Sequence, residues 1–312
     1  MKVDAKTILI SGAGGFLGGE LIKQLGNNPN YNILALTSNK SKLKMRFKEI
    51  KNISYISVND WNDGTFVWKS VDVLIHCAFT IKSDNELLAT SLEFTKKIFE
   101  DAKKHKVSSV INMSSKSVYG TKSKPLWMES LQVSPENSYA LAKYASEIIA
   151  DTVLRDSDTR YTSIRLASLI GPGFDMRAIS KLIKSALENK TIKIVGGKQT
   201  FEFLDIRDAA GALISLISSS QEKWCPIYNL GNSERKTIIE IANIVSCLAS
   251  DYVDAPILIE LEEKNTELDI GMDSSLFYDA TGWKAQYTMR DTLDSIFKYY
   301  VAKKMKDGNL DE

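Results

Sequence analysis

The chain has 312 residues, of which 44% are hydrophobic and 25% are charged, and these ordinary globular proportions exclude a disordered or repeat protein. Its formal net charge of +1, with lysines scattered among acids, excludes the basic footprint of a nucleic-acid-binding protein. Its apolar runs fall far short of the ~20 residues that cross a bilayer, and its first residues do not resemble a cleavable signal peptide. We therefore expect a cytoplasmic protein with neither a membrane nor a nucleic acid as its partner.

Short apolar runs alternate with amphipathic stretches between residues 6 and 165, which is the pattern of βαβ units with helices on both faces of a parallel sheet. The predicted strands cover residues 7–11, 33–37, 53–58, 71–77, 107–113 and 161–166. Six such strands predict an α/β fold with a Rossmann-type, doubly wound parallel sheet.

A glycine-rich loop follows the first predicted strand and precedes a helix. Gly12, Gly15 and Gly18 suit a turn that brings backbone N–H groups and a helix N-terminus against a pyrophosphate. A tight structural turn is the alternative, but the strand before the loop and the helix after it favour dinucleotide binding. We assign these glycines, with Phe16 and Leu17, to the cofactor site.

The second predicted strand ends where an NAD-binding unit usually carries an acid for the ribose 2′-hydroxyl. This chain has Thr37, Ser38, Asn39 and Lys40 there, whose hydroxyls, amide and cation could accept a 2′-phosphate. This composition favours NADP(H), while NAD(H) stays possible, as does a solvated loop that makes no cofactor contact.

The cofactor assignment includes three more residues, which follow the third and fourth predicted strands. Asp60 and Trp61 could hold the adenine edge through side chain and backbone, although a simple strand cap is an equal alternative. Ala78 follows the fourth predicted strand.

Tyr139 and Lys143 stand one helical turn apart on the same face of a predicted helix. A fixed cation beside the phenol would lower its pKa from ~10 towards neutrality, so that Tyr139 could exchange a proton with a carbonyl or carbinol. Ser115 lies at the carboxyl end of a predicted strand, where open α/β sheets bind ligands, and could hydrogen-bond the same oxygen. We predict that these three residues are catalytic; Ser115 alone would indicate only a turn.

After residue 171 the alternation of apolar runs and amphipathic stretches becomes less regular. The predicted helices there are 176–189 and 237–250, and the predicted strands are 192–195 and 256–260. We expect a Rossmann domain over residues 1–168, to which the chain returns around 199–231. Residues 169–312 then form mainly a smaller mixed α/β substrate-binding region. The histidines and cysteines are too few and too scattered to predict a metal site.

The glycine loop, Ser-Ser-x-x-Val-Tyr-Gly at 114–120 and Tyr-x-x-x-Lys at 139–143 resemble the extended short-chain dehydrogenase/reductases, the NAD-dependent epimerase/dehydratase family. The resemblance implies that Ser115 and Tyr139 contact the reacting oxygen while Lys143 holds the nicotinamide ribose. It also implies hydride transfer between nicotinamide and a sugar carbon, with nucleotide-linked sugars as substrates.

Two departures from the family pattern narrow this expectation. Family 4,6-dehydratases carry an Asp-Glu pair where this chain has Lys116 and Ser117, which counts against dehydration. The family's epimerases often grip the diphosphate with an asparagine and an arginine at the positions of Ser168 and Phe201. The residues that could compensate are Arg177, Lys198 and Lys264.

The leading hypothesis is an NADPH-dependent reductase of a keto group, in particular the 4-keto group of a nucleotide-linked 6-deoxysugar. A nucleotide-sugar 4-epimerase with tightly bound NAD is the alternative, and a non-catalytic NAD(P)-sensing protein is a third hypothesis. Many members of the resembled family pair through the helix that carries the tyrosine and its neighbour, so we expect a homodimer.

Overall fold

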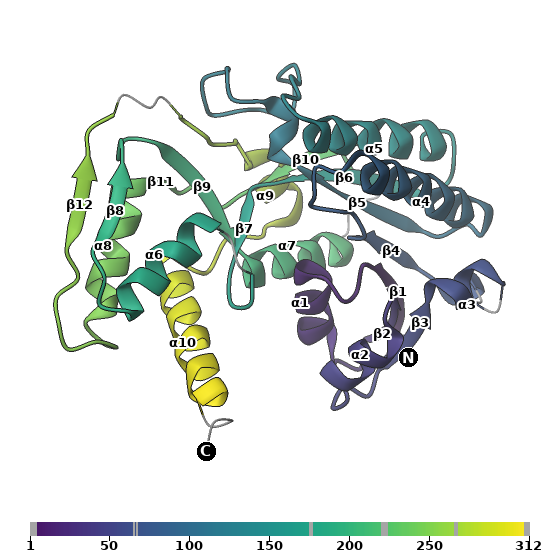
Figure 1. The fold of residues 1–312 in the computed structure, drawn as a ribbon. Helices are drawn as coiled ribbons and strands as arrows, with labels where there is room; N and C mark the ends of the chain where they lie inside the picture. The colour runs from purple at the N-terminus through teal and green to yellow at the C-terminus, as the bar shows by residue number, and fades with distance from the viewer. Residues whose placement is uncertain are drawn as a thin grey trace.

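The computed structural model describes residues 5–64, 66, 68–174, 177–219, 224–264 and 268–308 (Figure 1). A seven-stranded parallel sheet forms its centre, in the spatial order β10-β6-β5-β4-β1-β2-β3. Its strands are β1 (Lys6–Ser11), β2 (Tyr31–Thr37), β3 (Ile53–Ser57), β4 (Val73–His76), β5 (Ser109–Ser115), β6 (Arg160–Leu166) and β10 (Ile227–Leu230). The predicted doubly wound α/β fold is confirmed, and β10 adds a seventh strand to the six predicted.

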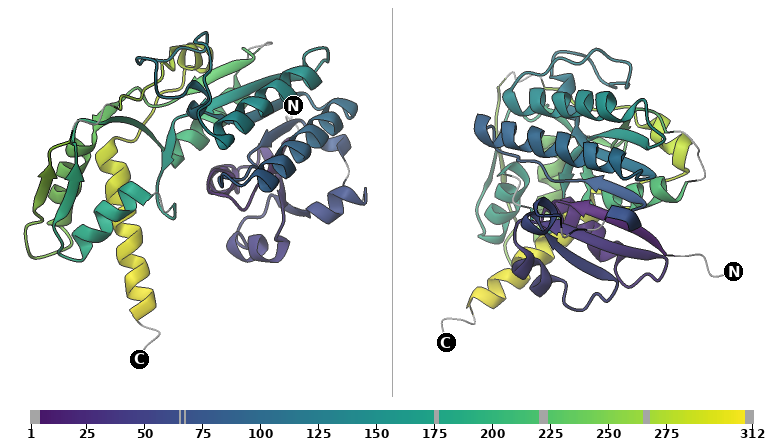
Figure 2. Two further views of the ribbon diagram at one scale, coloured as in Figure 1. Left: turned by 45° about the horizontal axis from the view of Figure 1, so that its top comes forward. Right: turned by 90° about the vertical axis from the view of Figure 1, so that its right-hand side faces the viewer.

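Helices cover both faces of this sheet, because alternate side chains of each strand point to opposite sides. In β1, Ile8 and Ile10 enter one apolar cluster and Leu9 enters another. The first face is covered by α1 (Phe16–Leu25), α2 (Lys40–Arg46) and α7 (Ile206–Ser218). The second is covered by α3 (Val58–Asn62), α4 (Asn85–Lys104) and α5 (Ser138–Leu154), and Figure 2 shows α4 and α5 running side by side.

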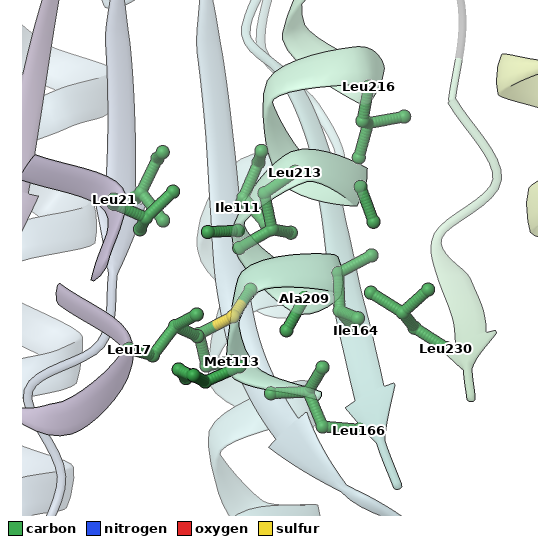
Figure 3. Packing of buried hydrophobic residues seen from close by; sticks show 14 of the residues in the cluster. Leu17, Leu21, Ile111, Met113, Ile164, Leu166, Ala209, Leu213, Leu216 and Leu230 are labelled. Carbon is green, nitrogen blue, oxygen red and sulfur yellow. The ribbon is translucent and has the colours of Figure 1, made fainter. Parts of the chain in front are cut away.

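The cluster on the first face joins distant parts of the chain. Leu17 and Leu21 of α1 pack with Met113 of β5 and Leu213 of α7, as Figure 3 shows. Burial of such side chains contributes roughly 1.5–3 kcal/mol each. This packing fixes the start of α1, directly after the glycine loop, relative to the end of β5, where Ser115 lies.

A smaller region lies beside the sheet and has its own apolar cluster. It contains a three-stranded sheet of β11, β9 and β7, a two-stranded sheet of β12 and β8, and three helices. Its elements are β7 (Ser168–Ile170), α6 (Arg177–Leu187), β8 (Ile192–Val195), β9 (Thr200–Asp205), β11 (Arg235–Thr237), α8 (Ile238–Ala249), β12 (Ile259–Glu262) and α10 (Met289–Gly308). A further helix, α9 (Ser275–Thr281), packs against β10. The domain boundary at residue 168 stays a prediction.

Two predicted elements of the smaller region differ slightly from the structure. The strand expected at 256–260 begins only at Ile259, and α6 ends two residues before the predicted position 189.

None of the helices in the described part of the chain combines the length and apolar character that crossing a bilayer would require.

Candidate active site

The glycine-rich loop lies at the carboxyl edge of the sheet, between β1 and α1. Gly12 has a φ of +69°, and a Cβ there would stand 2.7 Å from the backbone nitrogen of Ala78. A Cβ on Gly18 would stand 2.4 Å from the carbonyl oxygen of Gly12. Gly15 caps α1 without any side-chain hydrogen bond, so the first N–H groups of the helix stay open to a ligand. The backbone therefore forms a cradle that fits a dinucleotide pyrophosphate.

A first cavity, of about 580 Å³, lies between this loop, the end of β2 and α4. Thr37, Ser38 and Asn39 line it together with Gly12, Gly15 and Ala78. Within this group, the Thr37 hydroxyl accepts a hydrogen bond from the Asn39 backbone at 3.2 Å. The structure thus brings six of the residues assigned to the cofactor to one cavity, and no carboxylate is among the described residues that line it.

Three other assigned residues, Lys40, Asp60 and Trp61, have partners outside this cavity. The Lys40 ammonium donates to the Asp60 carboxylate at 3.0 Å, and Asp60 closes a capping box with Ser57 at the start of α3. Hydrogen bonds from Ser57 and Lys40 hold the pKa of Asp60 at about 2. Trp61 is buried and donates its indole N–H to Asp101 of α4 at 3.0 Å. Lys40, Asp60 and Trp61 do not line the first cavity, so we do not retain them as cofactor ligands.

Sequence reasoning missed two cations of α2 that do line the first cavity, Lys42 and Arg46. They stand four residues apart after the N-cap Asn39, and so share one helix face. The Arg46 guanidinium donates to the Gly14 carbonyl of the glycine loop at 3.3 Å and also lines the second cavity. Their spacing after a helix cap was the available signal.

The second cavity, of about 700 Å³, is the candidate active site. Ser115, from the end of β5, meets Tyr139 and Lys143, from the first turns of α5, in its lining. Phe16 and Leu17, the first two residues of α1, line the same cavity. The Phe16 ring stacks on Phe174, the residue after Gly173, with ring centroids 4.7 Å apart. The three residues predicted to be catalytic are therefore neighbours in space.

The Ser115 hydroxyl has a defined set of partners. Its oxygen accepts hydrogen bonds from the Ser117 amide at 3.2 Å and from the Ser117 hydroxyl at 2.9 Å. A hydroxyl has two acceptor positions and one proton, so the Ser115 proton is left to face Tyr139, with which it shares a hydrogen bond. Ser117, which replaces a dehydratase acid in the family pattern, thus orients Ser115.

Lys143 is buried and positioned by its surroundings. Its ammonium donates to the Met113 carbonyl at 2.8 Å and lies 3.8 Å from the centroid of the Phe79 ring. Burial lowers its pKa to about 7, while the charges of Cys77 and Glu147 act in the opposite direction.

The expectation that Lys143 lowers the pKa of Tyr139 is wrong for the arrangement in this structure. Burial raises the pKa of Tyr139, and the hydrogen bond with Ser115 is what opposes that rise. The physical reason is that Lys143 directs its ammonium to a backbone carbonyl and an aromatic face, whereas Tyr139 lies edge-on to the same Phe79 ring, with centroids 6.4 Å apart.

A buried polar network connects the elements that carry the residues of this site. The Arg165 guanidinium of β6 donates to both carboxylate oxygens of Glu147, at 3.0 and 2.8 Å, and Glu147 also accepts from the Ser114 hydroxyl. The third guanidinium nitrogen donates to the Tyr119 hydroxyl at 2.9 Å. The network ties α5, which carries Lys143, to the end of β5.

The residues assigned to the substrate are only partly brought together. Ser168 lines the second cavity, whereas Phe201 packs against Phe203 and Lys198 is exposed on the loop before β9. Neither Phe201 nor Lys198 lines that cavity, because β9 directs Phe201 towards its apolar neighbours. Arg177 begins α6, but its side chain lies outside the described residues.

A parallel sheet, a glycine cradle and a Ser-Tyr-Lys cluster at its carboxyl edge define a dinucleotide-dependent enzyme of the extended short-chain dehydrogenase/reductase type. The sequence model of the NAD dependent epimerase/dehydratase family matches residues 8–231, and the chain belongs to this family. It is accordingly an NAD-dependent oxidoreductase or epimerase.

Similar proteins come from several branches of this family. An uncharacterized UDP-glucose epimerase, YtcB, of Bacillus subtilis is 22% identical over 87% of this chain and 92% of its own. A dTDP-4-dehydro-6-deoxy-D-allose reductase of a Streptomyces species is 23% identical over 77% of this chain and 80% of its own. The structure of a UDP-glucuronic acid 4-epimerase mutant from Bacillus cereus, solved with NAD, shares the fold with a TM-score of 0.83 at 21% identity, covering 95% of this chain and 99% of that one.

Proposed function

We propose that this enzyme uses NADPH to reduce a keto group on a sugar, specifically the 4-keto group of a nucleotide-linked 6-deoxysugar. The observation that carries the proposal is the second cavity, in which Ser115, Tyr139 and Lys143 meet in a lining that is mostly apolar. The similarity to a dTDP-keto-sugar reductase supports the same assignment.

The walls of that cavity suit a deoxygenated sugar. Phe79, Ile81, Leu169 and Phe174 line it, and their side chains offer no hydrogen bonds. A hydroxymethyl group against such walls would lose its partners from water at a cost of roughly 1–3 kcal/mol, whereas a methyl group would gain from burial. The 6-deoxy position of the proposed substrate therefore fits this lining better than a 6-hydroxyl group does.

The roles of the three polar residues follow from their partners. Bound NADPH supplies the hydride that reduces the carbonyl carbon. Tyr139 donates the proton to the carbonyl oxygen, and the Ser115 proton, directed by Ser117, hydrogen-bonds the same oxygen. Lys143, which donates to the Met113 carbonyl, would hold the nicotinamide ribose. Lys116 stands where the family's dehydratases carry an acid. It is partly buried, and burial lowers its pKa to about 8.

The test of this proposal is a screen of 4-keto-6-deoxysugar nucleotides with both reduced cofactors, following the loss of nicotinamide absorbance. We expect stoichiometric oxidation of NADPH by at least one of them. Interconversion of 4-epimers without net NADPH oxidation, together with NAD that copurifies with the protein, would instead establish the 4-epimerase alternative.

The first cavity predicts a preference for NADPH over NADH. Thr37 and Ser38 offer hydroxyls, and Lys42 and Arg46 offer charge, to a ribose 2′-phosphate. A charge-assisted hydrogen bond contributes roughly 1.5–3 kcal/mol, so the ratio of the two dissociation constants should be about tenfold or more. Thr37→Asp should reverse the preference, because its carboxylate would repel the phosphate.

A matched pair of lysines on α2 sharpens this measurement. Lys42→Ala should weaken NADPH binding, whereas Lys40→Ala should not, because Lys40 pairs with Asp60 outside the cavity. The dissociation constants must be compared at one salt concentration, since ions screen a phosphate contact. Equal affinities of the wild type for NADPH and NADH would reject the assignment of this loop.

We further propose a homodimer that pairs through α4 and α5. Leu87, Leu141 and Ile148 of these helices are large apolar side chains that are 43%, 60% and 50% exposed. Light scattering at micromolar concentration should give twice the chain mass of 34.8 kDa, and the monomer mass alone would reject the proposal. The cytoplasmic location stays a prediction.

A further inference from the structure

A third cavity, of about 450 Å³, lies between the C-terminal halves of α6 and α10, outside the Ser-Tyr-Lys cluster. Figure 1 shows these two helices next to each other in the smaller region, and they pack against one another. The walls carry three lysines and two tyrosines: Lys184, Tyr299, Tyr300, Lys303 and Lys304. Ligand cavities of ~300–1,000 Å³ hold molecules of nucleotide size.

The third cavity adjoins the candidate active site. Gly173 lines both of them, so the two spaces meet at a residue that has no side chain. Gly173 has a φ of +84°, and a Cβ built on it would approach the Tyr299 ring to 3.9 Å. A molecule that reacts at Tyr139 can therefore extend past Gly173 towards Tyr299.

The charge of the third cavity favours an anion. Among the described residues, three lysines and one glutamate line it, an excess of two positive charges. That glutamate, Glu188, is engaged by Lys190 at 2.5 Å. A hydrogen bond from Lys190 lowers the pKa of Glu188, and the charges of Lys190, Lys304 and Lys184 act in the same direction.

The candidate active site offers no comparable charge to a substrate phosphate. Among the described residues that line it, the cations are Arg46 and Lys143. Arg46 donates a hydrogen bond to the Gly14 carbonyl of the glycine loop, and Lys143 donates one to the Met113 carbonyl. Both cations are therefore engaged next to the residues assigned to the cofactor. A substrate diphosphate therefore needs cations from another element.

We propose that the cavity between α6 and α10 binds the nucleoside diphosphate of the substrate, with Lys303 and Lys304 at the phosphates and Tyr299 against the base. This inference rests on the proposed function, because it takes the substrate to be nucleotide-linked. The sugar then passes Gly173 and reaches Ser115 and Tyr139. Lys184, whose ammonium lies 5.1 Å from the centroid of the Tyr300 ring, adds to the positive field.

Calorimetric titration of UDP and dTDP into the intact protein tests this site without any turnover. The variant Lys303→Gln/Lys304→Gln should bind the preferred nucleotide at least tenfold more weakly than the wild type does. The matched control is Lys103→Gln/Lys104→Gln, two adjacent exposed lysines at the end of α4, which should bind like the wild type. All four lysines are exposed, so neither variant is expected to perturb folding.

Equal affinity of the three proteins for the nucleotide, or no binding of either nucleotide to the wild type, would overturn the inference. With a keto-sugar substrate, the Lys303→Gln/Lys304→Gln variant should show a KM raised at least tenfold and an unchanged kcat. Reduction with an unchanged KM would reject this site and leave the proposed function intact. Nucleotide binding that depends on these lysines, without reduction of any keto sugar, would reject the proposed reaction and leave the site intact.

Discussion

Tyr139→Phe is expected to lower kcat by about 100-fold or more while leaving the affinity for the cofactor unchanged. The substitution removes the proton that the phenol donates to the substrate oxygen, but keeps the ring that lies edge-on to Phe79. Single-turnover kinetics with the reduced cofactor, together with its dissociation constant, separates the chemical step from binding.

Another tyrosine of the same helix provides the control for this experiment. Tyr144 is partly buried on α5, but it does not line the second cavity. Tyr144→Phe should therefore keep kcat near its wild-type value. Near-normal turnover by Tyr139→Phe would remove the tyrosine from the chemistry, and an equal loss in both variants would indicate damage to α5 rather than loss of a proton donor.

Arg165→Met is expected to lower the free energy of unfolding by about 3–5 kcal/mol, because it leaves the Glu147 carboxylate charged, buried and without its cation. Both side chains are almost fully buried, with exposed fractions of 3% and 4%. Ser114 and Tyr119 would lose an ordered neighbour as well. Urea unfolding followed by circular dichroism measures the change.

Two further variants show whether burial of the charge causes this effect. Arg155→Met removes an arginine whose ion pair with Asp151 is exposed on α5, and should change the free energy of unfolding by less than about 1 kcal/mol. Glu147→Leu/Arg165→Met removes both buried charges and should recover part of the stability lost in Arg165→Met. Similar losses in Arg155→Met and Arg165→Met would contradict the argument.

The sequence predicted those parts of the structure that are determined by neighbouring residues. The strands of the parallel sheet were found because their apolar runs are bounded by turns and helices. The glycine loop was found because strand, loop and helix follow one another directly. Ser115, Tyr139 and Lys143 were recognised from spacing and position, and the structure brings them to one cavity.

Features that depend on distant residues were not predicted. Lys40 and Lys42 are nearly indistinguishable in the sequence, yet Asp60, 20 residues away, draws Lys40 from the first cavity. The raised pKa of Tyr139 depends on how deeply α5 is covered, which no local pattern reveals. The short strands β7 and β11, of three residues each, lack the length for a recognisable alternation.

The last strand of the central sheet comes from far along the chain, and this has a consequence for truncated forms. β10 pairs with β6 only after the chain has passed through half of the smaller region, and α7, on the same return, covers Ile164 and Leu166. A fragment that ended at residue 168 would leave β6 as an open edge above an uncovered apolar face. During synthesis, β6 cannot gain its outer partner before residues 206–230 have emerged, because that segment carries both α7 and β10.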